Sequence, residues 1–465
     1  MNSPEKRPTP VLLTLVGACI AFSLSQTLVV PALPALAKDF ETSPSAVSWV
    51  LTGFLLSASI ATPIAGKLGD LFGKGRVLTA VMLLFCAGGV INALAPSIEV
   101  VIAGRVLQGA AGGVFPLAFG IVRDTFPRDQ VAGGLAIVSA VFGIGGGIGL
   151  PLSGVIVDNV DLDWLFWISL VALPVAYGTH RFVPPSPPVA STRVDWPGAA
   201  ILSAALAAIL LGVSQASEWG WGSPANVGAI GGGLALVAVF VAVESRVAQP
   251  LIDLEVLRKP AVAATNLTGF LVGVAMFSSF LIFPQFAETP ASADYGFGFS
   301  VTQAGLLMMP TAVAQLLAGP PATRLVRRIG FRSLLSLGTA LISGSFLINT
   351  FAHKHPWELI VGGVLMGAGL TFSFAAMANL IVEAVPRSEV GIATGINTVM
   401  RTVGGSFGAA IVTAILTAGT GPLPTEHAYT SAFAFSAAAG ILATIATRLV
   451  PRPGGPSVRL EPVTE

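Results

Sequence analysis

The chain is a series of long apolar runs separated by short polar segments. About 20 apolar residues are needed for a helix to cross a bilayer, and only helices satisfy their own backbone groups over such lengths. The runs do not alternate between apolar and polar residues, which excludes an outer-membrane barrel. The pattern therefore predicts an all-α integral membrane protein with fourteen spans, at 11–33, 46–65, 77–95, 99–121, 134–157, 163–183, 197–214, 226–244, 262–286, 301–322, 333–351, 357–382, 391–416 and 428–449.

The first apolar run follows Lys6 and Arg7, as a secretory signal would. However, the run is longer than a signal core, and no small-residue cleavage site precedes polar mature sequence. We therefore expect an uncleaved first helix.

The basic residues test this topology independently. Of the 24 Lys and Arg residues, Lys38 and Lys354 fall on the side opposite the N-terminus, Arg105 and Arg401 lie inside spans, and all others fall on the N-terminal side. Because cytoplasmic loops carry the excess of Lys and Arg, both termini are predicted to be cytoplasmic. Arg outnumbers Lys, and Ala and Gly are abundant, which favours a bacterial inner membrane as the location.

The composition narrows the possible functions. Hydrophobic residues make up 54% of the 465 residues and charged residues only 10%, with a mean hydropathy of +0.82. A soluble domain carries about 25% charged residues, so a water-soluble enzyme is excluded. The net charge of +1 gives no indication of nucleic-acid binding. Two cysteines, four histidines and the lack of a phosphate-binding GxxxxGK[ST] motif predict no metal, no cofactor, no catalytic residues and no use of ATP.

The sequence resembles itself at a spacing near 259 residues. Residues 121–128 read IVRDTFPR and residues 380–387 read LIVEAVPR, while Gly145 and Gly149 match Gly404 and Gly408. This predicts two six-helix halves, at 1–183 and 260–450, with a Pro-rich linker and two inserted helices at 184–259 and a cytoplasmic tail at 451–465. Two repeated halves with a path between them are typical of transporters.

The loop after the second span reads GKLGDLFGKGR and ends at Arg76. Gly66 and Gly73 supply backbone freedom for a tight turn. Asp70 then pairs with Arg76, or it faces a helix N-terminus and its partial positive charge. Either contact would fasten the two halves together on the inner side as a conformational latch. The alternative is a short basic loop that only obeys the charge rule for cytoplasmic loops.

The fourth span contains the sequence GRVLQGAAGG. Arg105 and Gln108 lie three residues apart and therefore on one helical face. A charge inside a span is costly unless it faces a cavity or a partner, which favours a transport role for Arg105. The alternatives are that Arg105 extends its charge to the interface, six residues beyond Glu99, and that the glycines serve helix packing alone.

The fifth span contains the sequence GIGGGIGLPLSG. Its Gly143, Gly147 and Gly154 form a groove into which another helix fits, and Pro151 permits a kink. The alternative is a packing interface with no bearing on the direction of transport.

These three motifs together resemble the major facilitator superfamily. The spacing GxLxDxxGxxR matches its loop signature, and Arg105 to Gly109 matches an RxxQG element that the family links to proton transfer. The fifth span resembles the family's antiporter element GxxxGPxxGG, although Leu150 and Val155 replace two glycines. The segments PALP at 31–34, WVLTGFLL at 49–56 and NTVMRTVGG at 397–405, with the extra helix pair, resemble the 14-helix drug/proton antiporter branch. The resemblance implies efflux of drugs or antibiotics.

One position departs from that branch. The branch places an Asp two residues before Thr27, and this chain has Ser25 there. Acids lie only near the ends of spans, at Asp70, Asp124, Glu383, Glu99, Asp158 and Glu288. We therefore hypothesise that Glu288 or Asp158, at the outer mouth, couples protons to transport through Arg105.

Further candidates line the expected pathway. Arg401 is the second cation inside a span and follows Asn397 by one helical turn. Its alternatives are a structural pair with Glu383 or a bond to a backbone carbonyl. Gln26 lies in the first span, and such polar residues also serve as helix–helix hydrogen bonds.

A cavity with many apolar and few charged groups suits a small amphipathic organic molecule better than a sugar. We therefore expect a monomeric exporter that binds a small-molecule substrate and protons within the bilayer and works by alternating access. Uptake of a nutrient or metabolite by the same fold remains an alternative. A lipid scramblase or membrane enzyme would need a reactive cluster that the sequence does not show.

Overall fold

A computed structural model describes residues 8–42, 44–185, 195–247, 254–293, 295–386, 390–417 and 423–451. This part of the chain is helical throughout. Its helices are α1 (Pro8–Asp39), α2 (Pro44–Phe72), α3 (Lys74–Ala93), α4 (Ile98–Gly109), α5 (Val114–Thr125), α6 (Arg128–Asn159), α7 (Trp164–Trp167), α8 (Ala172–Phe182), α9 (Trp196–Ser214), α10 (Ala216–Trp219), α11 (Pro224–Glu244), α12 (Leu254–Arg258), α13 (Pro260–Glu288), α14 (Val301–Phe351), α15 (Pro356–Ala384), α16 (Val390–Thr417) and α17 (Glu426–Ala446).

Within the described residues, 11 helices are long and apolar enough to cross a membrane. The all-helical membrane class predicted from the apolar runs is therefore confirmed. The linker residues 186–194 and the tail from 452 onward lie outside the described part of the chain.

The largest difference from the predicted spans is at α14. The sequence predicts two spans, 301–322 and 333–351, with an Arg-rich loop between them. The structure has one helical segment of 51 residues whose backbone changes direction at Gly330, where φ is 77° and ψ is 166°. A positive φ favours glycine. The turn therefore needs only one non-helical residue, and the Arg-rich stretch before it stays helical.

Two other predicted spans are composite helices. The span at 99–121 consists of α4, the 3-10 turn Ala110–Gly113 and α5. The span at 163–183 consists of α7, the 3-10 turn Ile168–Val171 and α8. In the first of these, the turn falls at the two consecutive glycines, which lower helix propensity.

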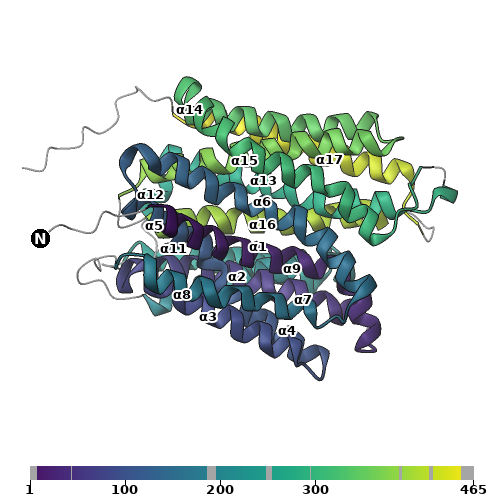
Figure 1. Ribbon diagram of the computed structural model, residues 1–465, viewed down its shortest axis with the longest axis horizontal. Helices are drawn as coiled ribbons and strands as arrows, with labels where there is room; N and C mark the ends of the chain where they lie inside the picture. Colours follow the sequence, from purple (N-terminus) through teal and green to yellow (C-terminus); the bar gives the residue numbers. More distant parts are fainter. Residues whose placement is uncertain are drawn as a thin grey trace, which may run out of the picture.

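The helices form two groups that lie along the long axis of the molecule (Figure 1). Helices α1 to α8 make up the N-terminal group and α13 to α17 the C-terminal group. The groups meet where α6 packs against α14 and α15, and where α2 and α5 pack against α16. The pair α9 and α11 packs together, and α9 contacts α2 and α16. The inserted pair therefore contacts both groups.

The same glycine packing occurs in both groups. A Cβ on Gly145 or Gly149 of α6 would lie 2.1 Å from atoms of Ser23 or Thr27 in α1. A Cβ on Gly404 of α16 would lie 2.0 Å from the backbone oxygen of Phe270 in α13, and a Cβ on Gly408 would lie 2.5 Å from the backbone oxygen of Val274. Only glycine allows these helices to approach so closely. The 259-residue sequence repeat thus corresponds to a repeated helix contact.

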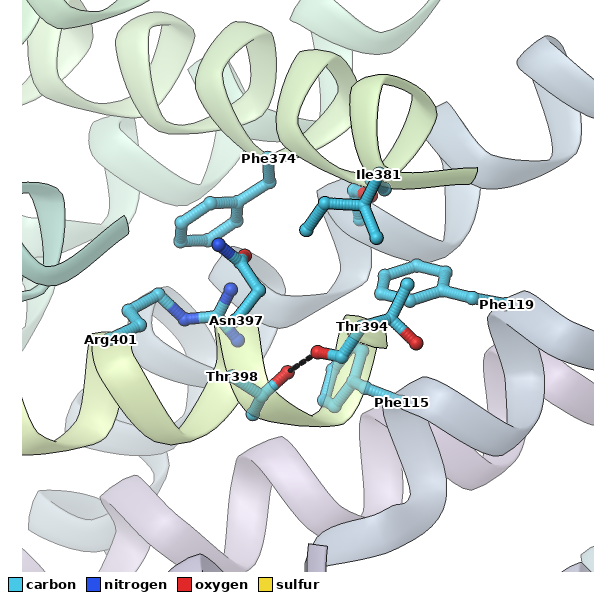
Figure 2. A pocket seen from close by; sticks show the side chains of 10 residues that line it. Phe115, Phe119, Phe374, Ile381, Thr394, Asn397, Thr398 and Arg401 are labelled. Atoms are coloured by element: carbon cyan, nitrogen blue, oxygen red, sulfur yellow. Dashed lines mark hydrogen bonds between the residues drawn. The ribbon is translucent and has the colours of Figure 1, made fainter. Parts of the chain in front are cut away.

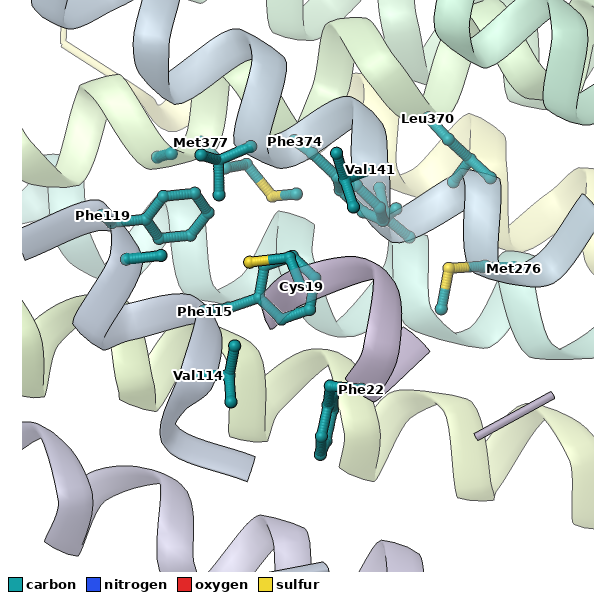
Figure 3. Packing of buried hydrophobic residues seen from close by; sticks show 14 of the residues in the cluster. Cys19, Phe22, Val114, Phe115, Phe119, Val141, Met276, Leu370, Phe374 and Met377 are labelled. Atoms are coloured by element: carbon teal, nitrogen blue, oxygen red, sulfur yellow. The ribbon is translucent and has the colours of Figure 1, made fainter. Parts of the chain in front are cut away.

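Apolar side chains from both groups fill the space between them (Figure 3). Cys19, Phe22 and Phe115 come from the N-terminal group, and Met276 and Phe374 come from the C-terminal group. The groups therefore meet at mid-length through apolar contact among these residues.

Candidate functional site

A cavity lies between the two helix groups (Figure 2). It is nearly closed in this conformation: its volume is about 10 Å³, which is about enough for one water molecule. A larger ligand therefore enters only when the helices around it move apart. Helices α5, α6, α15 and α16 supply its walls. The lining residues are Phe115, Phe119, Ser139, Phe374, Ala378, Ile381, Thr394, Asn397, Thr398 and Arg401.

The polar side of the cavity comes from a single face of α16. Thr394, Asn397, Thr398 and Arg401 follow the i, i+3, i+4, i+7 spacing of one helical face. The side chain of Asn397 donates from Nδ2 to the backbone oxygen of Thr265, at 3.2 Å, and to Oδ1 of Asn266, at 3.1 Å. These bonds fix the polar face of α16 against α13.

Arg401 is 6% exposed, and its guanidinium lies over the ring of Phe374, 4.5 Å from the centroid. Figure 2 shows the guanidinium beside Asn397 and facing the space between α15 and α16. Stacking on an aromatic face stabilises a desolvated guanidinium and fixes its plane. The site therefore combines one held cation, hydroxyl and amide groups, and three phenylalanine rings.

Sequence reasoning identified Asn397 and Arg401 but not the rest of this lining. The hydroxyls of Thr394 and Thr398 could have been found from their helical spacing to those two residues. Phe115, Phe119 and Phe374 could not, because phenylalanine is common in every span and only the packing decides which rings face the cavity.

Arg105 is fully buried in the N-terminal group. Its Nη1 donates to Ser25 Oγ at 2.8 Å and to Gln108 Oε1 at 3.0 Å, and its Nε donates to the backbone oxygen of Val50 at 3.1 Å. The guanidinium also lies 4.2 Å from the ring centroid of Phe54. Arg105 and Gln108 thus share a face as predicted, and the partner of Arg105 in the first helix is the departing residue Ser25.

Aromatic contacts connect Arg105 to the cavity. The ring of Phe54 lies 5.4 Å from Phe22, and Phe22 lies 6.4 Å from the cavity-lining ring of Phe115. Gln26, one turn after Phe22 in α1, is also buried, at 9% exposure. None of the contacts described for Arg105 is with Asp158 or Glu288, both of which are exposed at one end of the bundle. We call this end the Asp158 end.

At the opposite end, which we call the Asp70 end, Asp70 pairs with a cation other than Arg76, and this pairing stays within the N-terminal group instead of joining the two groups as the latch prediction requires. Lys74 Nζ lies 3.1 Å from Asp70 Oδ1 and 2.9 Å from Asp124 Oδ2. Asp70 and Lys74 are both nearly inaccessible, whereas Arg76 is exposed. Of the partners considered for Asp70, the structure therefore favours the start of α3, where Lys74 is the first residue, over Arg76.

Of the two glycines expected to form the turn at this end, only Gly73 lies in it. Gly73 has a φ of 93° and connects α2 to α3, so the turn favours glycine as predicted. Gly66 is buried inside α2. Across the groups, Arg123 Nη2 donates to the backbone oxygen of Val385 at 3.3 Å, so α5 and the end of α15 are also in contact here.

The helix with the antiporter-type motif forms the contact between groups at the Asp158 end. A Cβ on Gly154 of α6 would lie 2.9 Å from the Cα of Thr302 in α14, and a Cβ on Gly305 would lie 2.8 Å from Pro151. Thr302 Oγ1 also donates to Asp158 Oδ2 at 2.6 Å. Gly143 and Gly147 lie in α6, but their surroundings are outside the described residues.

A second polar cluster fastens the C-terminal group at the same end. His353 Nε2 lies 3.1 Å from Glu426 Oε1, and the Tyr295 hydroxyl donates to the backbone oxygen of Pro424. Burial, and then the nearby Glu426 carboxylate, raise the pKa of Tyr295, which keeps its hydroxyl protonated as a donor. This cluster joins the loop before α14 and the segment after it to the start of α17.

The family model of the Major Facilitator Superfamily matches residues 15–290 and 265–465. The chain belongs to this superfamily. The resemblance that the sequence motifs indicate is therefore confirmed. Major facilitators are transporters and not enzymes, so the cavity between the groups is a candidate transport site rather than an active site.

Relatives of this facilitator include bacterial efflux proteins. It is 26% identical to the multidrug transporter protein MdtP of Bacillus subtilis, over 91% of this chain and 79% of the relative. It is 30% identical to the cephamycin export protein CmcT of Amycolatopsis lactamdurans, over 94% of this chain and 92% of the relative. The chain is thus a multi-pass membrane protein related to multidrug and antibiotic efflux proteins.

A solved structure shares the fold. The human organic anion transporter MFSD10 (TETRAN) superposes with a TM-score of 0.66 at 16% identity, over 96% of this chain and all of that chain. At this identity the likeness shows the fold alone.

Proposed function

We propose that this facilitator exports small amphipathic organic molecules from a bacterial cell by proton antiport and alternating access. The observation that carries the proposal is the cavity between the two helix groups, where three phenylalanine rings face the polar side of α16. Such a site binds an apolar body and orients one polar group. Its relatedness to multidrug and antibiotic efflux proteins supports the direction of transport.

We further propose fourteen membrane spans, with α14 crossing twice and α6 and the composite α7–α8 segment crossing once each. The two halves comprise residues 1–183 and 260–450, with the Asp70 end and both termini in the cytoplasm. In this arrangement the halves rock about the cavity. The contact of α6 with α14 closes the outer side. On the inner side the Arg123–Val385 contact joins the halves, and the Asp70–Lys74–Asp124 cluster holds α2, α3 and α5 of the N-terminal half together.

Proton coupling in this proposal uses a carboxylate at an end of the bundle. The first choice is Asp158, because its bond to Thr302 joins the two halves and must break when the outer side opens. Breaking this bond leaves Oδ2 of Asp158 without its donor, and the proposal assigns the proton to this oxygen. Glu288 is the second choice. In either case the positive charge of Arg105 acts on the bound proton by electrostatic repulsion.

A dye-efflux assay tests the export proposal. Cells that express the protein are loaded with a panel of amphipathic dyes, and dye retention is measured with and without a protonophore. We expect lower retention than in cells with an empty vector, and we expect the protonophore to abolish the difference. Higher retention on expression would favour the uptake alternative, and efflux that survives the protonophore would exclude proton coupling.

The coupling acid is tested by amide substitutions. Asp158→Asn and Glu288→Gln are compared with Asp70→Asn, Asp124→Asn, Glu99→Gln and Glu383→Gln in proteoliposomes, and proton flux on substrate addition is recorded. We expect Asp158→Asn to abolish the substrate-induced flux and Glu99→Gln to leave it unchanged. Unchanged flux in all six variants would refute coupling by a carboxylate.

A further inference from the structure

The charge of the cavity wall sets which amphiphiles fit it. Among the described residues, the lining contains one ionisable side chain, Arg401, and no Asp or Glu. Its other polar groups are the hydroxyls of Ser139, Thr394 and Thr398 and the amide of Asn397, all of which are neutral. The described part of the lining therefore carries one positive charge and no negative charge.

The second buried arginine adds to the same sign of charge. Arg105 is fully buried, and its hydrogen-bond partners Ser25, Gln108 and Val50 are neutral. Its Nη2 has no hydrogen-bond partner among the described residues. Because Ser25 stands where an acid would neutralise this guanidinium, the charge of Arg105 is not compensated at that position. Charges in a low-dielectric interior act over longer distances than in water.

From these two arginines and the acid-free lining, we infer that the cavity recognises amphipathic organic anions and that the guanidinium of Arg401 receives the substrate's carboxylate. This inference rests on the proposed export function and specifies its substrate class. A guanidinium presents paired N–H donors that match a carboxylate. The stacking on Phe374 holds its plane, while the rings of Phe115 and Phe119 take the apolar body.

A cationic drug is the opposite case. A cation placed among Thr394, Thr398 and Asn397 would be desolvated beside Arg401 without a carboxylate in the described lining. Burial of an uncompensated charge near a like charge is unfavourable. The same cavity therefore discriminates by the sign of the charge and not by shape alone.

Two xanthene dyes of closely similar shape test this selectivity. Fluorescein carries a carboxylate that is ionised at about pH 7.5, whereas rhodamine 6G is the cationic ester on the same ring system. Uptake of each dye is measured in inside-out vesicles with the wild-type protein. We expect uptake of fluorescein to exceed that of rhodamine 6G by about tenfold or more, which corresponds to one lost charge-assisted hydrogen bond.

The variants separate recognition from folding. Arg401→Gln is expected to lower fluorescein uptake about tenfold while leaving rhodamine 6G uptake unchanged or higher, and Arg401→Lys is expected to restore part of it. Ser139→Asp leaves Arg401 in place and adds an acid to the α6 wall, so it should also shift the preference toward rhodamine 6G. Ser139→Asn adds nearly the same volume as Ser139→Asp without the charge, so the difference between these two variants isolates the effect of the charge.

Binding gives a readout that is independent of transport. In detergent, fluorescein should raise the Tm of the wild-type protein, should not raise that of Arg401→Gln, and should raise that of Ser139→Asn more than that of Ser139→Asp. Wild-type uptake of rhodamine 6G without fluorescein would overturn the inference and leave the export function standing. Equal loss of both dyes in Arg401→Gln and Ser139→Asp would also overturn it. If neither dye nor any other amphiphile is exported, the proposed function itself fails.

Discussion

Arg105 of α4 donates from Nη1 to the hydroxyl of Ser25 in α1 at 2.8 Å, inside the N-terminal group. Both residues are buried. In the drug/proton antiporter branch that the sequence resembles, an acid occupies the position of Ser25. The structure thus places this departure from the branch pattern in direct contact with the buried cation of the RxxQG element.

Ser25→Asp is expected to stabilise the protein. The new carboxylate would lie within reach of Arg105 and would turn a neutral hydrogen bond into a charge-assisted one, which contributes about 1.5–3 kcal/mol. The Tm of the purified protein in detergent should rise accordingly. Ser25→Ala should lower it, because Nη1 loses this acceptor and keeps only Gln108.

Ser23 provides the matched control in the same helix. Its buried hydroxyl has no hydrogen-bond partner among the described residues, so Ser23→Ala should change the free energy of unfolding by no more than about 0.5 kcal/mol and leave the Tm nearly unchanged. An equal loss in Ser23→Ala and Ser25→Ala would show that the bond to Arg105 contributes nothing specific.

Lys74→Met is expected to be strongly destabilising. Removal of the ammonium leaves the carboxylates of Asp70 and Asp124 without the cation that lies 3.1 Å and 2.9 Å from them. Loss of one member of a buried ion pair costs about 3–5 kcal/mol. Chemical unfolding of the purified variant measures this change.

Arg76 is the control for that cluster, because it is exposed and lies two residues after Lys74 in α3. Arg76→Gln should change stability by no more than about 0.5 kcal/mol. The double variant Lys74→Met with Asp70→Asn should recover part of the loss, since one buried charge is removed. A larger effect of Arg76→Gln than of Lys74→Met would restore Arg76 as the partner expected from the loop motif.

Gly154→Val is expected to hold the outer side open. A Cβ at this position would lie 2.9 Å from the Cα of Thr302, so the added side chain forces α6 and α14 apart. Labelling of Thr302→Cys by a membrane-impermeant maleimide should increase severalfold in the presence of Gly154→Val. The native Cys19 and Cys86 are buried and contribute little background.

Gly133 of α6 is the control, because a Cβ there meets nothing within 4 Å among the described residues. Gly133→Ala combined with Thr302→Cys should label like Thr302→Cys alone. If Gly154→Val leaves the labelling unchanged as well, the contact between α6 and α14 does not control access from this side.

Asn397→Ala is expected to weaken both folding and transport. Its Nδ2 group donates hydrogen bonds to the backbone oxygen of Thr265 and to Oδ1 of Asn266. A buried acceptor that loses its donor lowers the free energy of unfolding by about 1–3 kcal/mol. Thr402→Val removes a hydroxyl that bonds only within α16, to Thr398, and should be tolerated. Thermal unfolding and dye uptake of the two variants give the comparison.

The sequence predicts the helical class and the contact-forming glycines well, because both depend on local patterns. Gly145, Gly149, Gly404 and Gly408 stand at one repeat spacing, and each meets a neighbouring helix. The Arg-rich residues before Gly330 predict a polar loop between two spans, whereas the chain turns at Gly330 alone. In the structure the polar residues continue the helix and a single positive φ changes the direction.

The candidate site was predicted only where a residue is unusual for its surroundings. Arg105, Asn397 and Arg401 are conspicuous in apolar runs, and all three are buried. The rings that complete the cavity are ordinary residues of their spans, and their role depends on which face each helix turns toward the other group. The sequence does not single out Lys74, because its two acidic partners are brought together only by the packing of α2, α3 and α5.

The close glycine contacts of α6 with α1, and of α16 with α13, limit where this molecule can deform. Helices packed this closely cannot slide past one another without steric overlap, so each pair moves as one rigid body. In a transport cycle, the relative movement of these helix pairs would then occur at the interfaces of α6 with α14 and of α2 with α16. A small molecule bound at either interface would block this movement without occupying the cavity. These two interfaces are therefore the places where a non-competitive inhibitor would act.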